Sequence, residues 1–68
     1  MNKFAENLGW LMKGTEISQG TLAKLLNVKQ QTISRYANGE REPGIDTLIE
    51  IAKIFDVTVG QLLGTEEY

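Results

Sequence analysis

Four polar side chains that lie close together in the sequence could form hydrogen bonds with the edges of nucleic-acid bases. Gln30 and Gln31 carry amides that donate and accept at once, which suits adenine N6 and N7. Ser34 adds a hydroxyl, and the guanidinium of Arg35 suits guanine O6 and N7. At helical spacing these residues share one outward face, with Asn38 a turn further on. The pattern predicts a base-reading helix, and the two glutamines favour a half-site that contains A·T pairs.

The apolar residues around this face predict two short helices separated by a tight turn. Leu22 and Leu26 lie one turn apart on the first helix, and Ile33 and Tyr36 lie on the second. Each helix therefore has an apolar stripe that must pack against the other helix or against a common core. Small Ala23 lies where the two helices would cross. This arrangement is a helix-turn-helix, whose second helix can enter the major groove of DNA.

The segment before these helices predicts another helix over about residues 3–12, because its apolar side chains form one stripe: Phe4, Leu8, Leu11 and Met12. Gly14 is expected to end this helix in the left-handed conformation. Ser18 is expected to cap the next helix, residues 19–26, by accepting a hydrogen bond from one of its first amides. Asn27 tolerates the left-handed backbone that the turn needs.

The C-terminal half predicts a long apolar helix and a short one. The base-reading helix starts near Lys29 or Gln30 and ends at Asn38, because Pro43 lacks an amide hydrogen and prevents a continuous helix. A broad apolar stripe then follows, formed by Ile45, Leu48, Ile49, Ala52 and Phe55 and widened by Ile51 and Ile54. Thr58 and Gln61 have the spacing of a capping box for a short helix that ends at Gly64. Residues 64–68 are expected to fray.

Length and composition limit both the fold and the chemistry. A chain of 68 residues supports one core, so we expect a single all-α domain over residues 1–68, a compact bundle of five short helices with the helix-turn-helix at about 18–38. Because the sequence has no cysteine and no histidine, disulfides, thiolate or imidazole metal sites and histidine-based catalysis are excluded. The serines have no base partner and the glycines form no phosphate-binding loop. We predict that the chain is not an enzyme and holds no metal or cofactor.

The formal net charge of −2 is unusual for a protein that binds nucleic acid, but the charge is unevenly distributed. Residues 18–41 have a net charge of +3, from Lys24, Lys29, Arg35 and Arg41 against Glu40. Residues 42–68 have a net charge of −5, since Lys53 is the one basic residue among six acidic ones. The positive charge therefore lies on the predicted reading unit. The acidic remainder limits the number of phosphate contacts and their salt-dependent contribution to affinity.

With these elements in order, the chain resembles the DNA-binding domains of the Cro and lambda-repressor type, the Xre-like helix-turn-helix family that includes phage repressors. The residues that carry the resemblance are ISQGTLAKLLNVKQQTISRYANGEREP at 17–43, followed by TLIEIAKIFDV and TVGQLL. The resemblance covers nearly the whole chain. It implies a lambda-repressor-like fold and a role in transcription regulation.

The resemblance also implies a role for individual residues. The positions expected to contact base edges are Gln30, Gln31, Ser34 and Arg35. Gln19, at the start of its helix, matches a position whose amide binds a backbone phosphate. The full set of expected phosphate contacts is Gln19, Lys29, Thr32, Asn38 and Arg41.

Three departures from the family pattern affect the scaffold. Asn27 replaces the usual turn glycine, and Lys29 stands where serine or threonine often caps the reading helix. Many members have an arginine and a glutamate that form an ion pair at the positions occupied here by Met12 and Ala37. Loss of one partner alone would leave a poorly solvated charge without its counterion. Replacement of both partners by apolar residues avoids this cost. It predicts an apolar contact between Met12 and Ala37.

Trp10 is not explained by the helical stripe, and two interpretations stay open. We favour packing of Trp10 under the C-terminal segment near Leu62 or Tyr68. The alternative is a partner surface, where exposed aromatic residues are enriched. A single reading helix recognises few base pairs, so we also expect a weak homodimer through the last helix, formed by Val59, Leu62, Leu63 and Tyr68.

The sequence therefore predicts a sequence-specific regulator that binds double-stranded DNA, a repressor on a palindromic operator, with the reading helix in the major groove. The alternative is a protein-interaction or antitoxin-like module with the same fold and little DNA binding. The N-terminal segment lacks the apolar run of a signal peptide, and no stretch reaches the ~20 apolar residues that span a bilayer. We expect a bacterial cytoplasmic or nucleoid protein.

Overall fold

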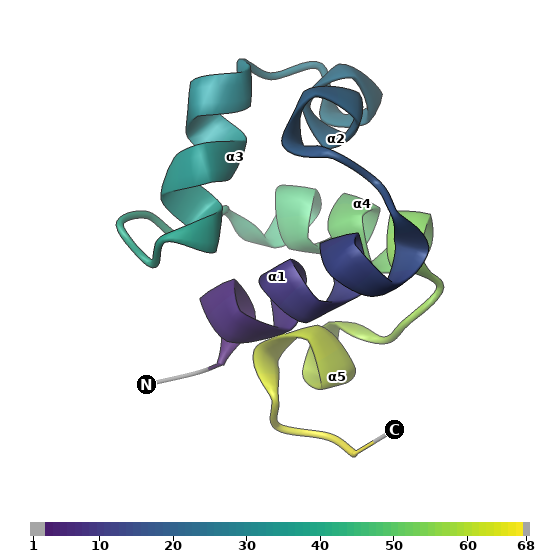
Figure 1. Cartoon of the computed structure of the whole chain (residues 1–68). Coiled ribbons are helices and arrows are strands. Elements are labelled where there is room, and N and C mark those ends of the chain that lie inside the picture. The colour runs from purple at the N-terminus through teal and green to yellow at the C-terminus, as the bar shows by residue number, and fades with distance from the viewer. Residues whose placement is uncertain (1–2, 68) are drawn as a thin grey trace.

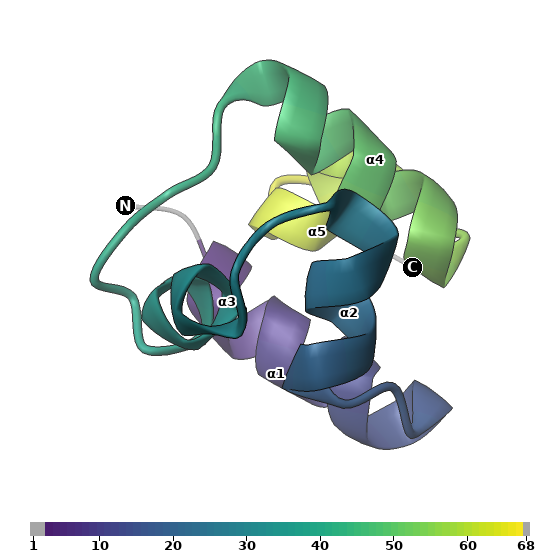
Figure 2. The ribbon, with the colours of Figure 1, turned by 90° about the horizontal axis from the view of Figure 1, so that it is seen from above.

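Five helices follow one another along residues 3–67, the part of the chain that the computed structural model describes (Figure 1). They are α1 (Phe4–Thr15), α2 (Gln19–Leu26), α3 (Gln30–Ala37), α4 (Ile45–Phe55) and α5 (Val59–Leu63). Seen from above, α1 and α4 form opposite faces, with α2 and α3 on either side (Figure 2). The predicted all-α fold of five short helices is confirmed.

The core takes at least one fully buried aliphatic side chain from every helix. Accessibility falls to 0% at Leu8, Leu22, Ile33, Ile51 and Leu62. Around them lie the other buried hydrophobic residues, Phe4, Ala23, Tyr36, Ala52 and Phe55. The rings of Phe4 and Tyr36 meet edge to face with centroids 6.1 Å apart, which joins α1 to α3. The helix-turn-helix is thus fixed on a core shared by all five helices.

The helix boundaries follow several of the predicted capping signals. Ser18 Oγ accepts a hydrogen bond from the Thr21 amide at 3.1 Å and caps α2. Thr58 and Gln61 form the complete capping box at the start of α5. Asn27 ends α2 with a φ of 56°. These three predictions are confirmed.

The predicted end of the first helix is wrong, because α1 continues through Gly14 to Thr15. Glu16, with a φ of 59°, takes the left-handed position instead of Gly14. The Ile17 amide then donates to the Met12 carbonyl at 3.1 Å, and the Ile17 side chain packs against the core. The end of α1 is determined by the packing of Ile17 against the core. This packing outweighs the preference of Gly14 for the left-handed conformation.

The apolar stripe predicted for α4 is wider than the surface that its neighbours cover. Ile45 is 63% exposed and Ile49 is 39% exposed, so neither belongs to the core. The two residues are one turn apart on the flank of α4, whereas Ile51, Ala52 and Phe55 face inward. The expectation that Ile45 and Ile49 belong to the buried stripe of α4 is therefore wrong.

Hydrogen bonds from α1 and from Lys3, the residue before it, hold the last turn of α5. Asn7 Nδ2 donates to the carbonyls of Leu62 at 3.1 Å and Gln61 at 3.3 Å. The Lys3 amide donates to the Leu63 carbonyl at 2.9 Å. The carbonyls of Leu62 and Leu63, at the end of α5, thereby gain hydrogen-bond partners, and the Gln61 carbonyl gains a second donor beside the Gly64 amide. A helix of one turn and a half is stable here because α1 holds it.

The segment after α5 also has fixed partners. The amides of Thr65 and Glu66 donate to the Gly60 carbonyl at 2.9 and 3.1 Å. Residues 65–67, part of the tail for which we expected fraying, thus lie back over α5, and Tyr68 is outside the described residues.

Two interaction surfaces inferred from the sequence need correction. Leu62 is fully buried and cannot contribute to a dimer surface, and Val59 and Leu63 are partly buried against the core. Trp10 is 65% exposed, so the favoured interpretation that it packs under the C-terminal segment is wrong. The alternative, a partner surface around Trp10, stays open.

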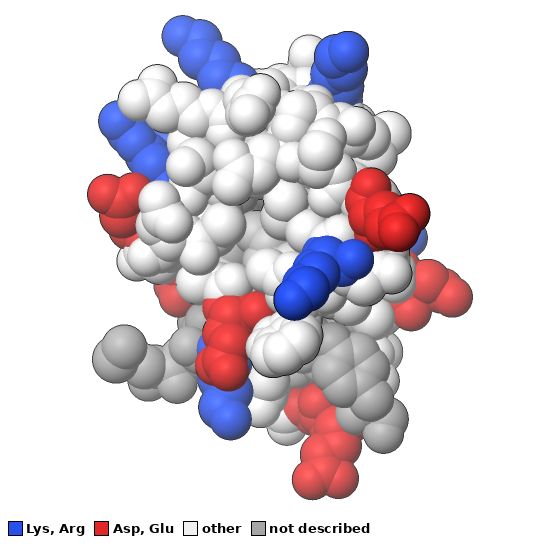
Figure 3. Space-filling model, viewed as in Figure 1, with Lys and Arg blue, Asp and Glu red and all other residues white. Residues whose placement is uncertain are grey.

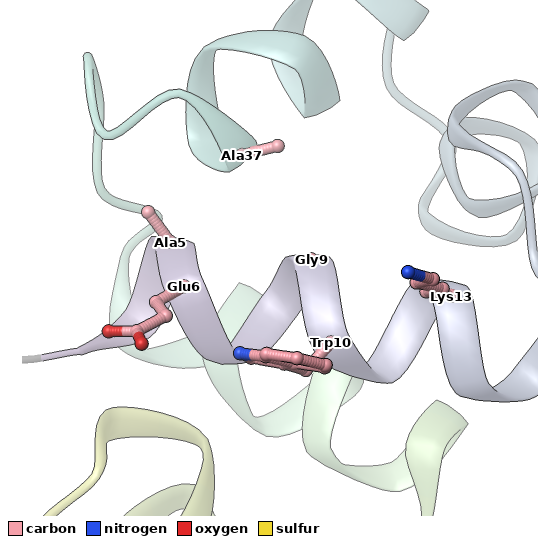
Figure 4. A pocket seen from close by; sticks show the side chains of 6 residues that line it. All are labelled: Ala5, Glu6, Gly9, Trp10, Lys13 and Ala37. Atoms are coloured by element: carbon pink, nitrogen blue, oxygen red, sulfur yellow. The ribbon is translucent and has the colours of Figure 1, made fainter.

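Met12 and Ala37, the residues that replace the ion pair common in the family, are both partly buried and packed against the same core. Ala37 faces α1 across Ala5 and Gly9 (Figure 4). A direct contact between Met12 and Ala37 stays a prediction.

Candidate nucleic-acid interface

The polar face of α3 is exposed because its apolar face is held by the core. Ile33 and Tyr36 are buried, whereas Gln30, Gln31 and Arg35 are exposed. Ser34 is half-buried between them. The structure therefore brings all four predicted base-contacting residues onto the outer side of one helix.

The turn between α2 and α3 is short and hydrogen-bonded. Asn27 reverses the chain, and the Val28 amide donates to the Ala23 carbonyl at 3.0 Å. Ala23 is buried, and its small side chain leaves room for close packing of the two helices. Val28 packs against the core and anchors the turn. The orientation of α3 is thus fixed by its neighbours.

The side chain of Gln30 lies over the beginning of α2. A Cβ atom added at Gly20 would lie 3.3 Å from Gln30 Oε1, closer than most real contacts of this kind. Gly20 follows Gln19, the predicted phosphate anchor, directly in α2. The structure therefore places Gln30 beside the segment that carries Gln19. The sequence reading did not identify Gly20, although a glycine at the second position of a helix could have indicated a close approach.

The predicted phosphate contacts lie at the start of α2, on α3 and on both sides of α3. Lys29 immediately precedes α3 and is exposed, and Asn38 and Arg41 follow the helix and are exposed. Thr32 and Gln19 are half-buried. The five residues therefore flank the base-reading face, and their individual roles stay predictions.

The comparison with protein families agrees with this geometry. Residues 4–62 match the family model described as Helix-turn-helix. This chain belongs to the helix-turn-helix family. The predicted resemblance to Cro and lambda-repressor domains is thereby confirmed.

Curated relatives of this helix-turn-helix domain are bacterial regulators. It is 37% identical over 65 residues to the HTH-type transcriptional activator BcrR of Enterococcus faecalis, covering 96% of this chain and 32% of that protein. It is 36% identical over 63 residues to the HTH-type transcriptional regulator YqaE of Bacillus subtilis, covering 93% of this chain and 54% of that protein. The chain thus spans about a third and about half of these two relatives. Their names describe transcriptional regulators, in agreement with the prediction that the chain is not an enzyme.

Solved structures show the same fold. A transcriptional regulator from Listeria innocua superposes with a TM-score of 0.92 at 35% identity, over 100% of this chain and 64% of that chain. The DNA-binding domain of the P22 C2 repressor superposes with a TM-score of 0.83 at 28% identity, over 93% of this chain and 86% of that chain. The lambda-repressor-like fold is therefore confirmed.

Positive charge gathers at one end of this helix-turn-helix domain. At the upper end, over α2 and α3, the charged side chains in view are basic, whereas lower in the view basic and acidic side chains are mixed (Figure 3). The basic residues at 24, 29, 35 and 41 are all exposed. The base-reading face is thus flanked by cations, although the whole chain has a net charge of −2.

Two features are absent from residues 3–67, the described part of the chain: a metal-ligand cluster and a helix that could span a membrane. No group of three or more metal-ligating side chains is found in this part of the chain. No helix in it has both the length and the apolar character needed to cross a membrane.

Proposed function

We propose that this helix-turn-helix domain binds double-stranded DNA in a sequence-specific way, as part of a transcriptional regulator. The observation that carries the proposal is the outer face of α3, where Gln30, Gln31 and Arg35 are exposed while Ile33 and Tyr36 are held in the core. Amide and guanidinium groups on one helix face suit adenine and guanine edges in the major groove. The likeness to the P22 C2 repressor's DNA-binding domain supports the same role.

We further propose that the domain acts as a repressor and binds a palindromic operator as a dimer, in the bacterial cytoplasm or nucleoid. One α3 helix reads only a few base pairs, and two-fold related copies would double the site. Occupying an operator is enough to block transcription, whereas activation needs a further contact with the transcription machinery. The P22 C2 likeness favours repression, although BcrR is named an activator.

The test is a titration of a fluorescent duplex at several salt concentrations. Each phosphate neutralised by the protein lowers log K with log salt by a slope of about −0.9. With few cations around α3, we expect a slope of about −2 to −4 per domain. Affinity that does not change with salt would contradict DNA binding.

A protein-interaction module is the second candidate, and two observations favour it. The chain has a net charge of −2, and Trp10 is 65% exposed. The salt titration separates the candidates, because a module that binds only protein leaves the duplex unbound at every salt concentration.

A further inference from the structure

The outer face of α1 carries Glu6, Trp10 and Lys13, which are four and three residues apart and follow one another along the helix (Figure 4). This spacing places them on one side of α1, opposite the buried Phe4 and Leu8. All three side chains are exposed. The face is therefore not used by the core of this chain.

Trp10 exposes more of its surface than any other large apolar side chain described in residues 3–67, at 65%. Beside it lies an open hollow of about 370 Å³, whose small residues are Ala5, Gly9 and Ala37. An exposed indole next to a shallow hollow with small side chains is a feature of protein contact surfaces, where aromatic anchors fill pockets on the partner.

Gly9 leaves the backbone of this face accessible. A Cβ atom added at Gly9 would meet nothing within 4 Å, so the chain itself does not require glycine at this position. Glycine is a poor residue inside a helix. The open backbone at Gly9 leaves room for a partner side chain to approach this face closely, although Gly14 on the same helix is equally open.

The charges on the face identify the partner. Glu6 and Lys13 flank Trp10 with opposite signs at nearly equal distances along α1. In an antiparallel pair of α1 helices related by a two-fold axis near Trp10, Glu6 of each copy lies opposite Lys13 of the other. The face is self-complementary, as an isologous interface requires. We propose that it is a homodimer surface, in which Trp10 of each copy packs into the hollow of the other.

This pairing also leaves the two α3 helices at the same end of the dimer. α1 crosses the view in Figure 1, with α2 and α3 above it, and in Figure 2 it forms one face of the molecule. A vertical two-fold axis in front of α1 reverses α1 in the second copy and leaves both helix-turn-helix units at the upper end. The proposed dimer surface on α1 does not include the base-reading face of α3, so the dimer can be tested without DNA.

The dimer should be weak. The 12 residues of α1 extend over about 18 Å, which is too short to bury the ~800 Å² per partner of a standard interface. We expect a dissociation constant between about 10 µM and 1 mM, measurable by analytical ultracentrifugation of the whole chain without DNA.

Charge reversal tests the pairing. Glu6→Lys and Lys13→Glu, each alone, place like charges opposite each other, and we expect each to raise the dissociation constant at least about tenfold. An equimolar mixture of the two variants restores both pairs and should form a heterodimer. The double variant Glu6→Lys/Lys13→Glu should dimerise like the original chain. Such mutual rescue would not follow from a loss of folding.

Trp10→Ala should also raise the dissociation constant at least about tenfold. Ile45→Ser is the matched control, since Ile45 is similarly exposed at 63% but lies on α4. Circular dichroism establishes that each variant is folded. A chain that stays monomeric at 1 mM, a variant mixture that stays monomeric, or a dimer lost with Ile45→Ser but kept with Trp10→Ala would overturn the proposal.

Discussion

Gln30 is the residue whose position depends most on its neighbour across the helix-turn-helix. Its amide lies beside Gly20, where a methyl group would come within 3.3 Å of Oε1. Because Gly20 has no side chain, the Gln30 amide can lie over the beginning of α2 without strain. Gly20, which has no polar side chain, thus affects the position of Gln30, a predicted base contact.

Gly20→Ala should separate stability from recognition. Alanine is a better helix residue than glycine by roughly 1 kcal/mol, so the thermal midpoint should hold or rise. The new Cβ should displace the Gln30 amide and weaken binding to the preferred duplex several-fold. Gly14→Ala is the matched control, because nothing lies within 4 Å of its added Cβ. Equal DNA affinity of both variants would contradict the link.

Gln31 and Gln19 are predicted to have different roles. Gln31→Ala, or Gln30→Ala, should cost about 1–3 kcal/mol at one base pair and relax the preference there. Gln19→Ala should weaken specific and non-specific duplexes alike, because phosphate contacts carry no sequence information. Binding is measured on a set of single-base variants of the preferred site. If the three substitutions had the same effect on every duplex, the assigned roles would be wrong.

At the level of the elements, α5 depends on α1. The helix has five residues. Two of its last carbonyls accept hydrogen bonds from the Asn7 side chain of α1, and a third accepts one from the amide of Lys3, which immediately precedes α1. Such a short helix has little stability of its own. The tertiary hydrogen bonds therefore maintain the C-terminal wall of the core around Leu62.

Asn7→Ala should lower the free energy of unfolding by about 1–2 kcal/mol, because the Leu62 carbonyl loses its donor while the Gln61 carbonyl keeps only the Gly64 amide. Thr15→Ala is the control, since it removes an exposed bond within α1, from Thr15 Oγ1 to the Leu11 carbonyl. Urea unfolding followed by circular dichroism measures both. A loss for Asn7→Ala no larger than that for Thr15→Ala would show that α5 does not depend on this side chain.

The order of the helices and several of their caps could be predicted because the signals are local. The Ser18 cap, the Thr58 and Gln61 box and the Asn27 turn each depend on residues a few positions apart. Three features could not be predicted, because they depend on which surfaces other helices cover: the end of α1 at Thr15, the exposure of Ile45 and the exposure of Trp10. Of the candidate site, the outward face of α3 followed from periodicity, whereas the contact between Gln30 and Gly20 needed the orientation of two helices.

At the scale of the whole molecule, the uneven distribution of charge determines which side of the protein would face DNA. Residues 18–41 have a net charge of +3, and residues 42–68 have a net charge of −5. The acidic part would repel DNA from the wrong side, and the basic end would attract it. The affinity for DNA should therefore be moderate. The charge distribution should mainly orient the protein so that its basic end faces the DNA.

Arg41→Ala should reduce the slope of log K against log salt by about one unit if Arg41 contacts a phosphate. Lys53→Ala removes the same charge from α4 and serves as the control. Its slope should equal that of the original chain. If both variants shifted the slope equally, net charge rather than a local contact would account for the effect.

Selection from a pool of randomised duplexes tests sequence-specific binding by α3 most directly. After several rounds, sequencing should reveal one enriched motif with two-fold symmetry and A·T pairs in each half-site, as Gln30 and Gln31 predict. The Gln31→Ala variant should lose the preference at one position of that motif. A selected pool with the same base frequencies as the starting pool would contradict the account.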